Sequence, residues 1–162
     1  MRRRRALAFA AILGLCVGCD HATKQLATSA LAGAETISFA SDTVRFELAR
    51  NPGAFLGVGA PLPSAVRALL FGVLVPLGLA VACVLAVRTE HPAARTLHGL
   101  ALVAGGGLGN WADRVLHGGT VTDFVSLGAG PLRTGVFNLA DVCIVAGFAL
   151  LLLPPGRRPG PT

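Results

Sequence analysis

The chain has 162 residues, of which 53% are hydrophobic and only 14% are charged, and its formal net charge is +6. A soluble domain carries about 25% charged residues, so this composition excludes an ordinary soluble protein and predicts a membrane protein. The positive charge predicts no nucleic-acid partner, because the basic residues lie at the edges of apolar segments and form no single patch. We expect one compact membrane domain over residues 1–162.

Four apolar segments predict four transmembrane helices, because each is near the roughly 20 residues that a helix needs to cross a bilayer. They cover about residues 6–27, 64–87, 96–115 and 136–153. The tail of about 154–162 is rich in Pro and Gly and is expected to be disordered.

The positive-inside rule predicts that both termini are cytoplasmic. Basic residues precede the first segment, separate the second from the third and follow the fourth: Arg2 to Arg5, Arg88 with Arg95, and Arg157 with Arg158. Residues of about 28–63 and 116–135 are then expected outside. In the first of these regions, apolar and polar residues alternate over Val44–Leu48, which predicts a strand in a small sheet on the membrane surface.

The first segment begins like a bacterial lipoprotein signal peptide. In MRRRRALAFAAILGLCVGCD, a basic start and an apolar run precede Cys19. Removal of this run would still leave three apolar segments, and Cys16 stands where a lipobox prefers an aliphatic residue. We interpret the run as a retained helix. The alternative is a lipidated membrane protein whose mature chain starts at Cys19.

Charged residues inside apolar segments are costly, about 2.5–3.5 kcal/mol at a helix centre, so they usually mark functional sites. Asp20 and Lys24 are four residues apart and can pair on one helix face. A second polar face follows closely spaced glycines, which allow helices to approach. It consists of Asn110, Asp113 and Arg114, after Gly105 to Gly107 and Gly109.

Two further aspartates stand near the same membrane face. Asp123 alone is typical of a turn, whereas Asp141 follows Asn138 on what is expected to be one turn of the fourth helix. Two carboxylates held close together share a proton, so one can act as base and the other as acid. Spacing alone leaves Asp113 open as a member of such a pair.

The cysteines and histidines indicate no further chemistry. Packing is the expected role of Cys16, Cys19, Cys83 and Cys143, with no disulfide. The histidines have no metal-ligand spacing such as H-E-x-x-H, so we expect no metal site and no cofactor.

Five motifs follow one another along almost the whole chain. They are D-x-x-T-K (Asp20 to Lys24), N-x-G-A-F (Asn51 to Phe55), G-G-x-x-G-N-x-x-D-R (ending at Arg114), V-x-D-F (Val121 to Phe124) and F-N-x-A-D (Phe137 to Asp141). In this order, on a frame of four helices, they resemble those of the lipoprotein signal peptidases, signal peptidase II.

The resemblance implies an aspartic endopeptidase of the bacterial inner membrane, with four helices, a small extracytoplasmic sheet and an active site near the periplasmic face. Its substrates would be diacylglyceryl-modified prolipoproteins, cut before the lipidated cysteine. The family's chemistry needs no cofactor, and we expect a monomer among membrane lipids. By this likeness Asp123 and Asp141 are the catalytic pair, and Asp20 with Lys24 braces the first helix. The residues that would bind substrate or support the pair are Asn51, Gly53, Asn110, Asp113, Arg114, Asn138 and Ala140.

The chain departs from the family pattern at three places. His21 replaces the usual Gln, Pro52 precedes Gly53, and the segment of 126–135 lacks aromatic residues. None of these departures removes a catalytic group.

A small transporter or proton-relay protein is the remaining alternative. Its acidic residues would have to be distributed through the depth of the membrane. Asp113, Asp123 and Asp141 are instead expected near one face, which favours chemistry at the surface.

Overall fold

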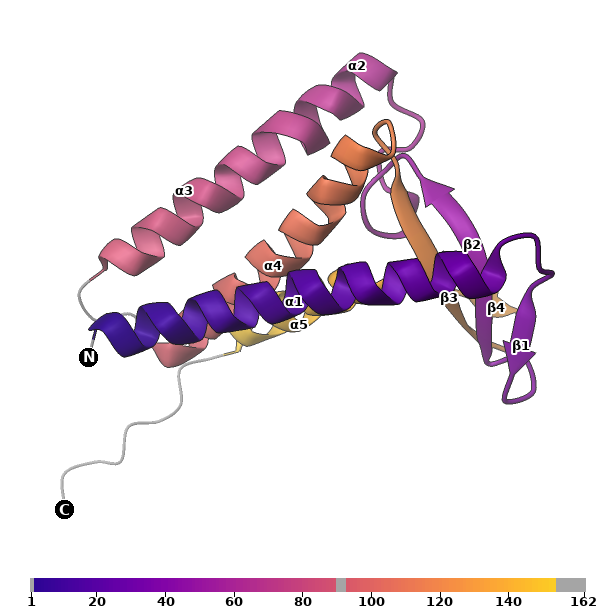
Figure 1. Cartoon of the computed structure of the whole chain (residues 1–162), viewed down its shortest axis with the longest axis horizontal. Coiled ribbons are helices and arrows are strands. Elements are labelled where there is room, and N and C mark those ends of the chain that lie inside the picture. The colour runs from indigo at the N-terminus through magenta and orange to yellow at the C-terminus, as the bar shows by residue number, and fades with distance from the viewer. Residues whose placement is uncertain (1, 90–92, 154–162) are drawn as a thin grey trace.

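The structure, a computed structural model, describes residues 2–89 and 93–153. Helices make up most of it, and an antiparallel sheet lies at one end of them (Figure 1). The long helical elements are α1 (Arg2–Leu31), α4 (Ala94–Leu116), α5 (Leu139–Leu152) and a continuous helix over Ser64–Arg88. That continuous helix comprises α2 (Ser64–Arg67), the π-helical η2 (Ala68–Leu74) and α3 (Val75–Arg88).

Each segment that was expected to be helical coincides with a helix, and the main differences lie at the ends of the first and last helices. The first helix extends to Leu31, and the last begins at Leu139 because Asn138 caps it. Among the described residues, two helices are long and apolar enough, by length and composition, to cross a membrane: Arg3–Leu31 and Ser64–Arg88. The apolar helix Leu139–Leu152 is shorter, so four crossings stay a prediction. The expected disordered tail, Arg157 and Arg158 lie outside the described residues.

Small residues let α1, α4 and α5 pack closely. A Cβ at Gly105 would lie 2.7 Å from the Cβ of Cys16 in α1, and one at Gly106 would overlap the carbonyl oxygen of Ala140 in α5. Such contacts require glycine, because the backbone of one helix touches the next. The glycines of the third expected segment therefore bring the polar ends of three helices together.

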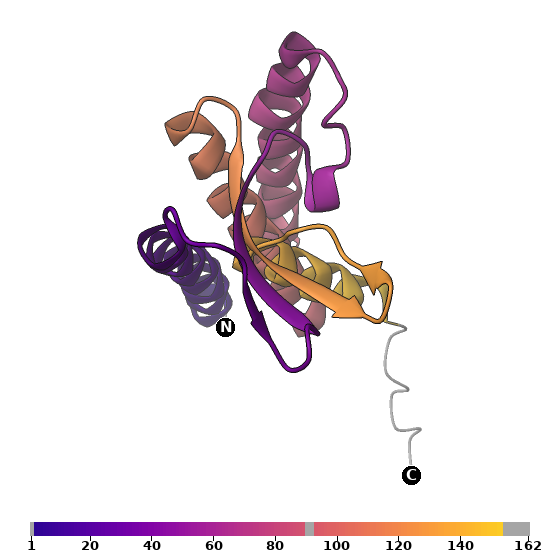
Figure 2. The ribbon, with the colours of Figure 1, turned by 90° about the vertical axis from the view of Figure 1, so that its right-hand side faces the viewer.

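The sheet has the strand order β1-β2-β3-β4, with antiparallel neighbours throughout. Its strands are β1 (Ile37–Phe39), β2 (Val44–Asn51), β3 (Val121–Ala129) and β4 (Leu132–Arg133). From the sheet end, Figure 2 shows β2 and β3 running in front of α5, with α1 to one side. The strand expected at Val44–Leu48 is thus the first part of β2.

No strand was expected within residues 116–135, where the structure has β3 and β4; their position outside the membrane stays a prediction. Val121, Thr122, Asp123 and Phe124 are all buried, so both faces of this part of β3 are covered. A strand covered on both faces need not alternate polar and apolar residues, and this one does not. Phe124 packs with Ala27 and Leu31 at the end of α1. The sheet is therefore fixed to α1, and residues 121–124 at the start of β3 are buried, whereas its end is largely exposed.

Candidate active site

Asp123 lies in the buried strand β3, not in a turn as its sequence context alone would suggest. Its side chain is 1% exposed. One carboxylate oxygen, Oδ2, accepts a hydrogen bond from Nδ2 of Asn51 at 2.9 Å, and Oδ1 accepts one from Nδ2 of Asn138 at 2.6 Å. Asn51 ends the neighbouring strand β2, so the pairing of β2 with β3 brings this donor to Asp123.

Asp141 lies in the first turn of α5 and is equally buried. Asn138 is the N-cap of this helix. Its side-chain Oδ1 accepts a hydrogen bond from the backbone N–H of Asp141 at 3.0 Å, and its backbone N–H donates to Oδ2 of Asp141. The other oxygen of Asp141 accepts from Nδ2 of Asn110 at 2.9 Å. Asn138 therefore contacts both aspartates, and its place before the helix, not within it, makes this possible.

Burial is the main cause that raises the pKa of Asp123, to about 6. The negative charge of Asp141 raises this pKa further, whereas the hydrogen bonds from Asn51 and Asn138 lower it because they favour the carboxylate. A carboxyl group with this pKa exchanges its proton close to neutral pH. Asp123 can therefore take part in proton transfer, which an ordinary surface aspartate does poorly.

A second polar cluster surrounds Lys24, which Asn110 connects with Asp141. The ammonium group of Lys24 lies 2.7 Å from Oδ2 of Asp20 and 3.3 Å from Oδ2 of Asp113. Asp20 also accepts from the backbone amide of Ala140, which ties α1 to the start of α5. Asp113 accepts from the amide of Thr122 at 2.8 Å and lies 3.6 Å from His117. Its carboxylate is thus engaged by Lys24 and the backbone of β3.

Arg114 holds the loop that follows β2. Its guanidinium group donates to the carbonyl of Gly53 at 2.5 Å and lies 5.1 Å above the ring of Phe71. Gly53 has no room for a side chain, because a Cβ would lie 2.6 Å from the carbonyl oxygen of Val58. Asn51 binds the same loop by accepting from the amide of Gly53 at 2.8 Å. The N-x-G motif therefore fixes this loop and one aspartate together.

A cavity of about 310 Å³ opens beside Asp141. Apart from Asp141 and Thr134 its lining is apolar, and it consists of Phe55, Leu56, Phe137, Val142, Val145 and Ala146. Sequence reasoning did not identify Leu56, Val142 or Val145 as site residues. Val145 could have been found from its position four residues after Asp141 on one helix face; nothing in the sequence marks Leu56.

All the residues expected at the site are brought to the sheet end of α1, α4 and α5. The three departures from the family pattern lie around it. His21 contacts Gln25 on the exposed side of α1, and Pro52 lines a second cavity, of about 440 Å³, beside Arg114. In the segment of 126–135, Arg133 lies 2.9 Å from Asp42 in the β1–β2 turn, so an ion pair fixes this hairpin without aromatic residues.

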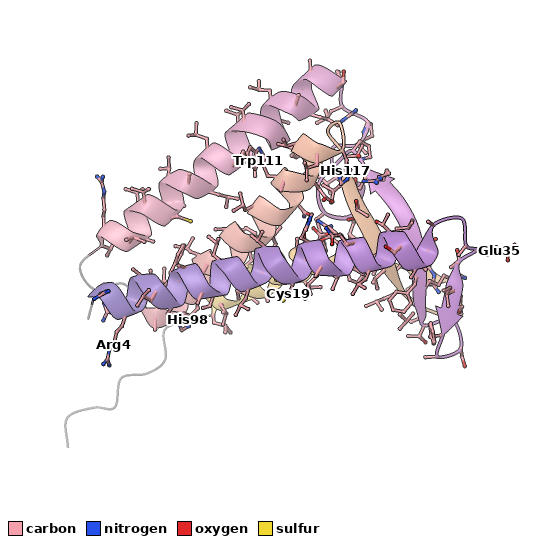
Figure 3. The ribbon with its side chains drawn as sticks, viewed as in Figure 1. Arg4, Cys19, Glu35, His98, Trp111 and His117 are labelled. Carbon is pink, nitrogen blue, oxygen red and sulfur yellow. The ribbon has the colours of Figure 1, made fainter. Side chains whose placement is uncertain are left out.

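The cysteines and acidic residues form no metal site within residues 2–89 and 93–153, where no group of three or more His, Cys, Asp or Glu could hold an ion. All four cysteines are free. Cys16 is buried between helices and Cys19 is exposed on α1 (Figure 3).

The arrangement of helices and sheet is found in other solved proteins. Two solved structures, described as bacterial membrane enzymes at 2.3 Å and 1.9 Å resolution, are similar with a TM-score of 0.74 and 22% identity. The likeness covers 90% of this chain and 85% and 90% of theirs, which establishes the fold.

The sequence comparisons identify the family. A lipoprotein signal peptidase of Rhodococcus jostii is 35% identical in an alignment that covers 98% of this chain and 80% of that protein. One of Bifidobacterium longum subsp. infantis is 33% identical in an alignment that covers 93% of this chain and 80% of that protein. Residues 12–154 match the family of signal peptidase (SPase) II. The chain belongs to the signal peptidase II family, and the resemblance seen in the five motifs is confirmed.

Proposed function

We propose that this protein removes signal peptides from diacylglyceryl-modified prolipoproteins by aspartic chemistry, with Asp123 and Asp141 as the catalytic pair. Family membership makes it a peptidase of the membrane that removes signal peptides from prolipoproteins. The assignment of the two aspartates rests on one observation: both are buried, and Asn138 contacts both of them beside an apolar cavity.

The two carboxyl groups can supply both proton transfers that peptide hydrolysis needs. One, as carboxylate, takes a proton from a water molecule that attacks the peptide carbonyl before the lipidated cysteine. The other, protonated, donates its proton to the carbonyl oxygen. As the C–N bond breaks, the first carboxyl group gives the proton taken from water to the departing amide nitrogen, and the second recovers its proton from the hydroxyl group of the intermediate. Asn51, Asn110 and Asn138 supply NH₂ donors to the pair, so they hold the carboxyl groups in place without competing for the proton.

The cavity beside Asp141 suits an apolar signal peptide. Phe55 and Leu56 from the loop after β2 line it together with Val142 and Val145 of α5. Arg114 and Asn51 fix the base of this loop, so a bound peptide would lie between a held loop and the catalytic pair.

We further propose that the sheet lies on the outer face of the inner membrane and that both termini are cytoplasmic. Arg88 ends α3 and Arg95 lies near the start of α4, at the end of the helices remote from the sheet (Figure 1). Arg4 lies at that same end of α1, whereas Glu35 lies beyond the other (Figure 3). This distribution of basic residues supports the proposed orientation. The collection of acids at one end, not along the helices, favours peptidase chemistry over ion transport.

The deciding experiment is cleavage of a diacylglyceryl-modified prolipoprotein in detergent micelles, followed by gel shift. Asn has nearly the size of Asp but cannot exchange a proton, so Asp123→Asn and Asp141→Asn should each abolish cleavage while the protein still folds. The double variant should be no worse than either single one, because residues that act as a unit fail together.

Asp113→Asn is the matched control, because Asp113 is a buried acid that contacts Lys24 and the backbone of β3. It should weaken activity or stability without complete loss. Substantial turnover by either variant of the pair, or inhibition of the natural protein by EDTA, would contradict the assignment.

A further inference from the structure

Lys24 is a buried cation with three partners. Its Nζ atom lies 2.7 Å from Oδ2 of Asp20, 3.0 Å from Oδ1 of Asn110 and 3.3 Å from Oδ2 of Asp113. An ammonium group has three protons and no acceptor, so these contacts use every donor that it has. Neutralising Asp20 within α1 would need only one of them. The contact with Asn110 therefore calls for a second explanation.

The contact with Lys24 decides which way the amide of Asn110 points. The oxygen and the NH₂ group of an asparagine are almost equal in size, so only their partners distinguish the two orientations. Lys24 can donate but cannot accept, so the oxygen of Asn110 must face Lys24. The NH₂ group then faces the other way, where it donates to Oδ1 of Asp141 at 2.9 Å.

The same orientation extends to the other aspartate through Asn138. The oxygen of Asn110 also accepts from Nδ2 of Asn138 at 3.0 Å, and this NH₂ group donates to Oδ1 of Asp123. With Asn110 reversed, two NH₂ groups would face each other and Asp141 would face an oxygen. The buried cation on α1 and the NH₂ group of Asn138 thus donate to the same oxygen of Asn110, and both favour the orientation in which Asn110 donates to Asp141.

We propose that Lys24 is a positioning residue for peptide hydrolysis: it fixes the amide orientation of Asn110, and through Asn110 and Asn138 it holds a donor against each catalytic aspartate. This inference rests on the proposed function, because it assumes that Asp123 and Asp141 carry out the reaction. It goes beyond the neutralisation of Asp20 within α1, which would require contact with Asp20 alone.

The charge of Lys24 gives the role a signature in the pH profile. Burial is the main cause that raises the pKa of Asp123 to about 6, and the positive charge of Lys24 acts in the opposite direction. Without Lys24 this pKa rises further, so the pH range in which the pair shares one proton moves to higher pH. The charged or titratable groups that surround Asp123 and Lys24 are Asp20 on α1, Asp113, Arg114 and His117 on α4, Asp141 on α5, and Arg50 on β2, which donates to Thr122.

The test compares two variants that differ only at Lys24. Asp20→Asn alone keeps Lys24 in contact with Asn110 and Asp113, and Asp20→Asn combined with Lys24→Met removes it. The double variant removes both members of the Asp20–Lys24 pair, which limits the cost to folding. Asp113 also loses Lys24 and keeps the amide of Thr122 and His117 as partners, so the thermal melt measures the remaining cost. The measurements are kcat and KM per folded enzyme between pH 4 and 9, with a diacylglyceryl-modified prolipoprotein as substrate, and a thermal melt.

We expect the double variant to have a kcat about 100-fold below that of Asp20→Asn, because misplaced catalytic groups cost this much, with little change in KM. Its profile should lie at higher pH than that of Asp20→Asn. Asp20→Asn alone should not move the profile to higher pH, because it removes a negative charge. Equal kcat and equal profiles in the two variants would overturn the proposal. So would a loss of kcat with an unchanged profile, because a purely structural lysine would give that result.

Failure of this proposal is distinguishable from failure of the proposed function. If Asp123→Asn and Asp141→Asn retain turnover, the catalytic pair itself is wrong. If they lose turnover while the Lys24 variants share one kcat and one profile, the pair stands and Lys24 only braces α1.

Discussion

The helix over Ser64–Arg88 and the group formed by α1, α4 and α5 differ in which side chains they expose and which they bury. The first keeps most of its apolar surface outward; Leu69, Leu77 and Leu85 are 53%, 57% and 61% exposed. It meets α4 at a few points, where Leu79 packs against Gly107 and Trp111 donates to the carbonyl of Gly72. The helix group instead buries Asp20, Lys24, Asp113 and Asp141.

This difference shows where the sequence is constrained. Lipid covers an exposed leucine as well as another helix does, so many apolar residues would serve along Ser64–Arg88. A buried carboxylate has no such substitute and needs a donor of the right geometry from the protein. Small substitutions in the group of α1, α4 and α5 should therefore impair the protein, whereas the helix over Ser64–Arg88 should tolerate exchanges between apolar residues.

Loss of a charge in the helix group should have the largest effect. Asp20→Ala leaves Lys24 without its nearest partner and the amide of Ala140 without its acceptor. Breaking a buried pair costs about 3–5 kcal/mol, so we expect low accumulation and a lower melting temperature in detergent. A variant that is fully stable but inactive would instead place Asp20 among the catalytic residues.

A single methyl group should distinguish the two regions next. Gly106→Ala places a Cβ against the carbonyl oxygen of Ala140, whereas Gly78→Ala on α3 has no heavy atom within 4 Å. Overpacking costs about 1–3 kcal/mol, and the shift of α5 should also displace Asp141 and reduce cleavage. Gly78→Ala should be neutral or slightly stabilising, because alanine favours a helix. Thermal melts and cleavage rates of the two variants check this contrast, and equal effects would contradict it.

The pKa of Asp123 should show how burial and neighbouring side chains control a carboxyl group inside the protein. Its pKa lies near 6, mainly because of burial, so the fully folded protein should release this proton well above the usual range of an aspartate. Asp141→Asn should lower this pKa, because it removes a neighbouring negative charge. Asn51→Ala should raise it, because it removes a hydrogen bond to the carboxylate. Carbon NMR of labelled aspartate in micelles measures both shifts, and a shift of either with the opposite sign would contradict this account.

The linkage to stability has a definite sign. The folded protein disfavours the ionised form of Asp123, so this group makes the fold more stable when it is protonated. That contribution is lost as the pH rises from the unfolded value, near 3.8, to about 6 and then stays constant. Asp123→Asn removes this pH dependence.

The helices were predictable from the sequence, because long apolar segments leave few alternatives in a membrane protein. The family and its candidate residues were predictable because five motifs fall in one order. The strand β3 was not, because a strand buried on both faces lacks the alternation that identified β2. Without β3, the sequence could not show that Asn51 reaches Asp123.

The position of Asn138 shows the same limit on a smaller scale. Spacing suggested that Asn138 and Asp141 share a helical turn, but whether an asparagine is inside a helix or caps it depends on its backbone conformation. Likewise, spacing left Asp113 open as a catalytic residue. The contacts with Lys24 and Thr122, which connect three elements distant in sequence, favour a supporting role.

The smallest effect should come from Cys19, and it brings the comparison down to two residues of one helix. Cys16 and Cys19 are three residues apart, yet Cys16 is buried against Gly105 and Cys19 is exposed. The backbone carbonyl of Cys19 accepts a hydrogen bond from Thr23, but an alanine would keep that carbonyl. Cys19→Ala should therefore leave localisation, mass and activity unchanged and alter stability by less than about 0.5 kcal/mol.

Cys16→Leu is the matched control and should destabilise by about 1–3 kcal/mol, because it overpacks the contact between α1 and α4. Intact-mass spectrometry of the natural protein and of both variants decides the matter. If Cys19→Ala lost a lipid-sized mass, Cys19 would be a lipid attachment site and the start of the chain a cleaved signal peptide.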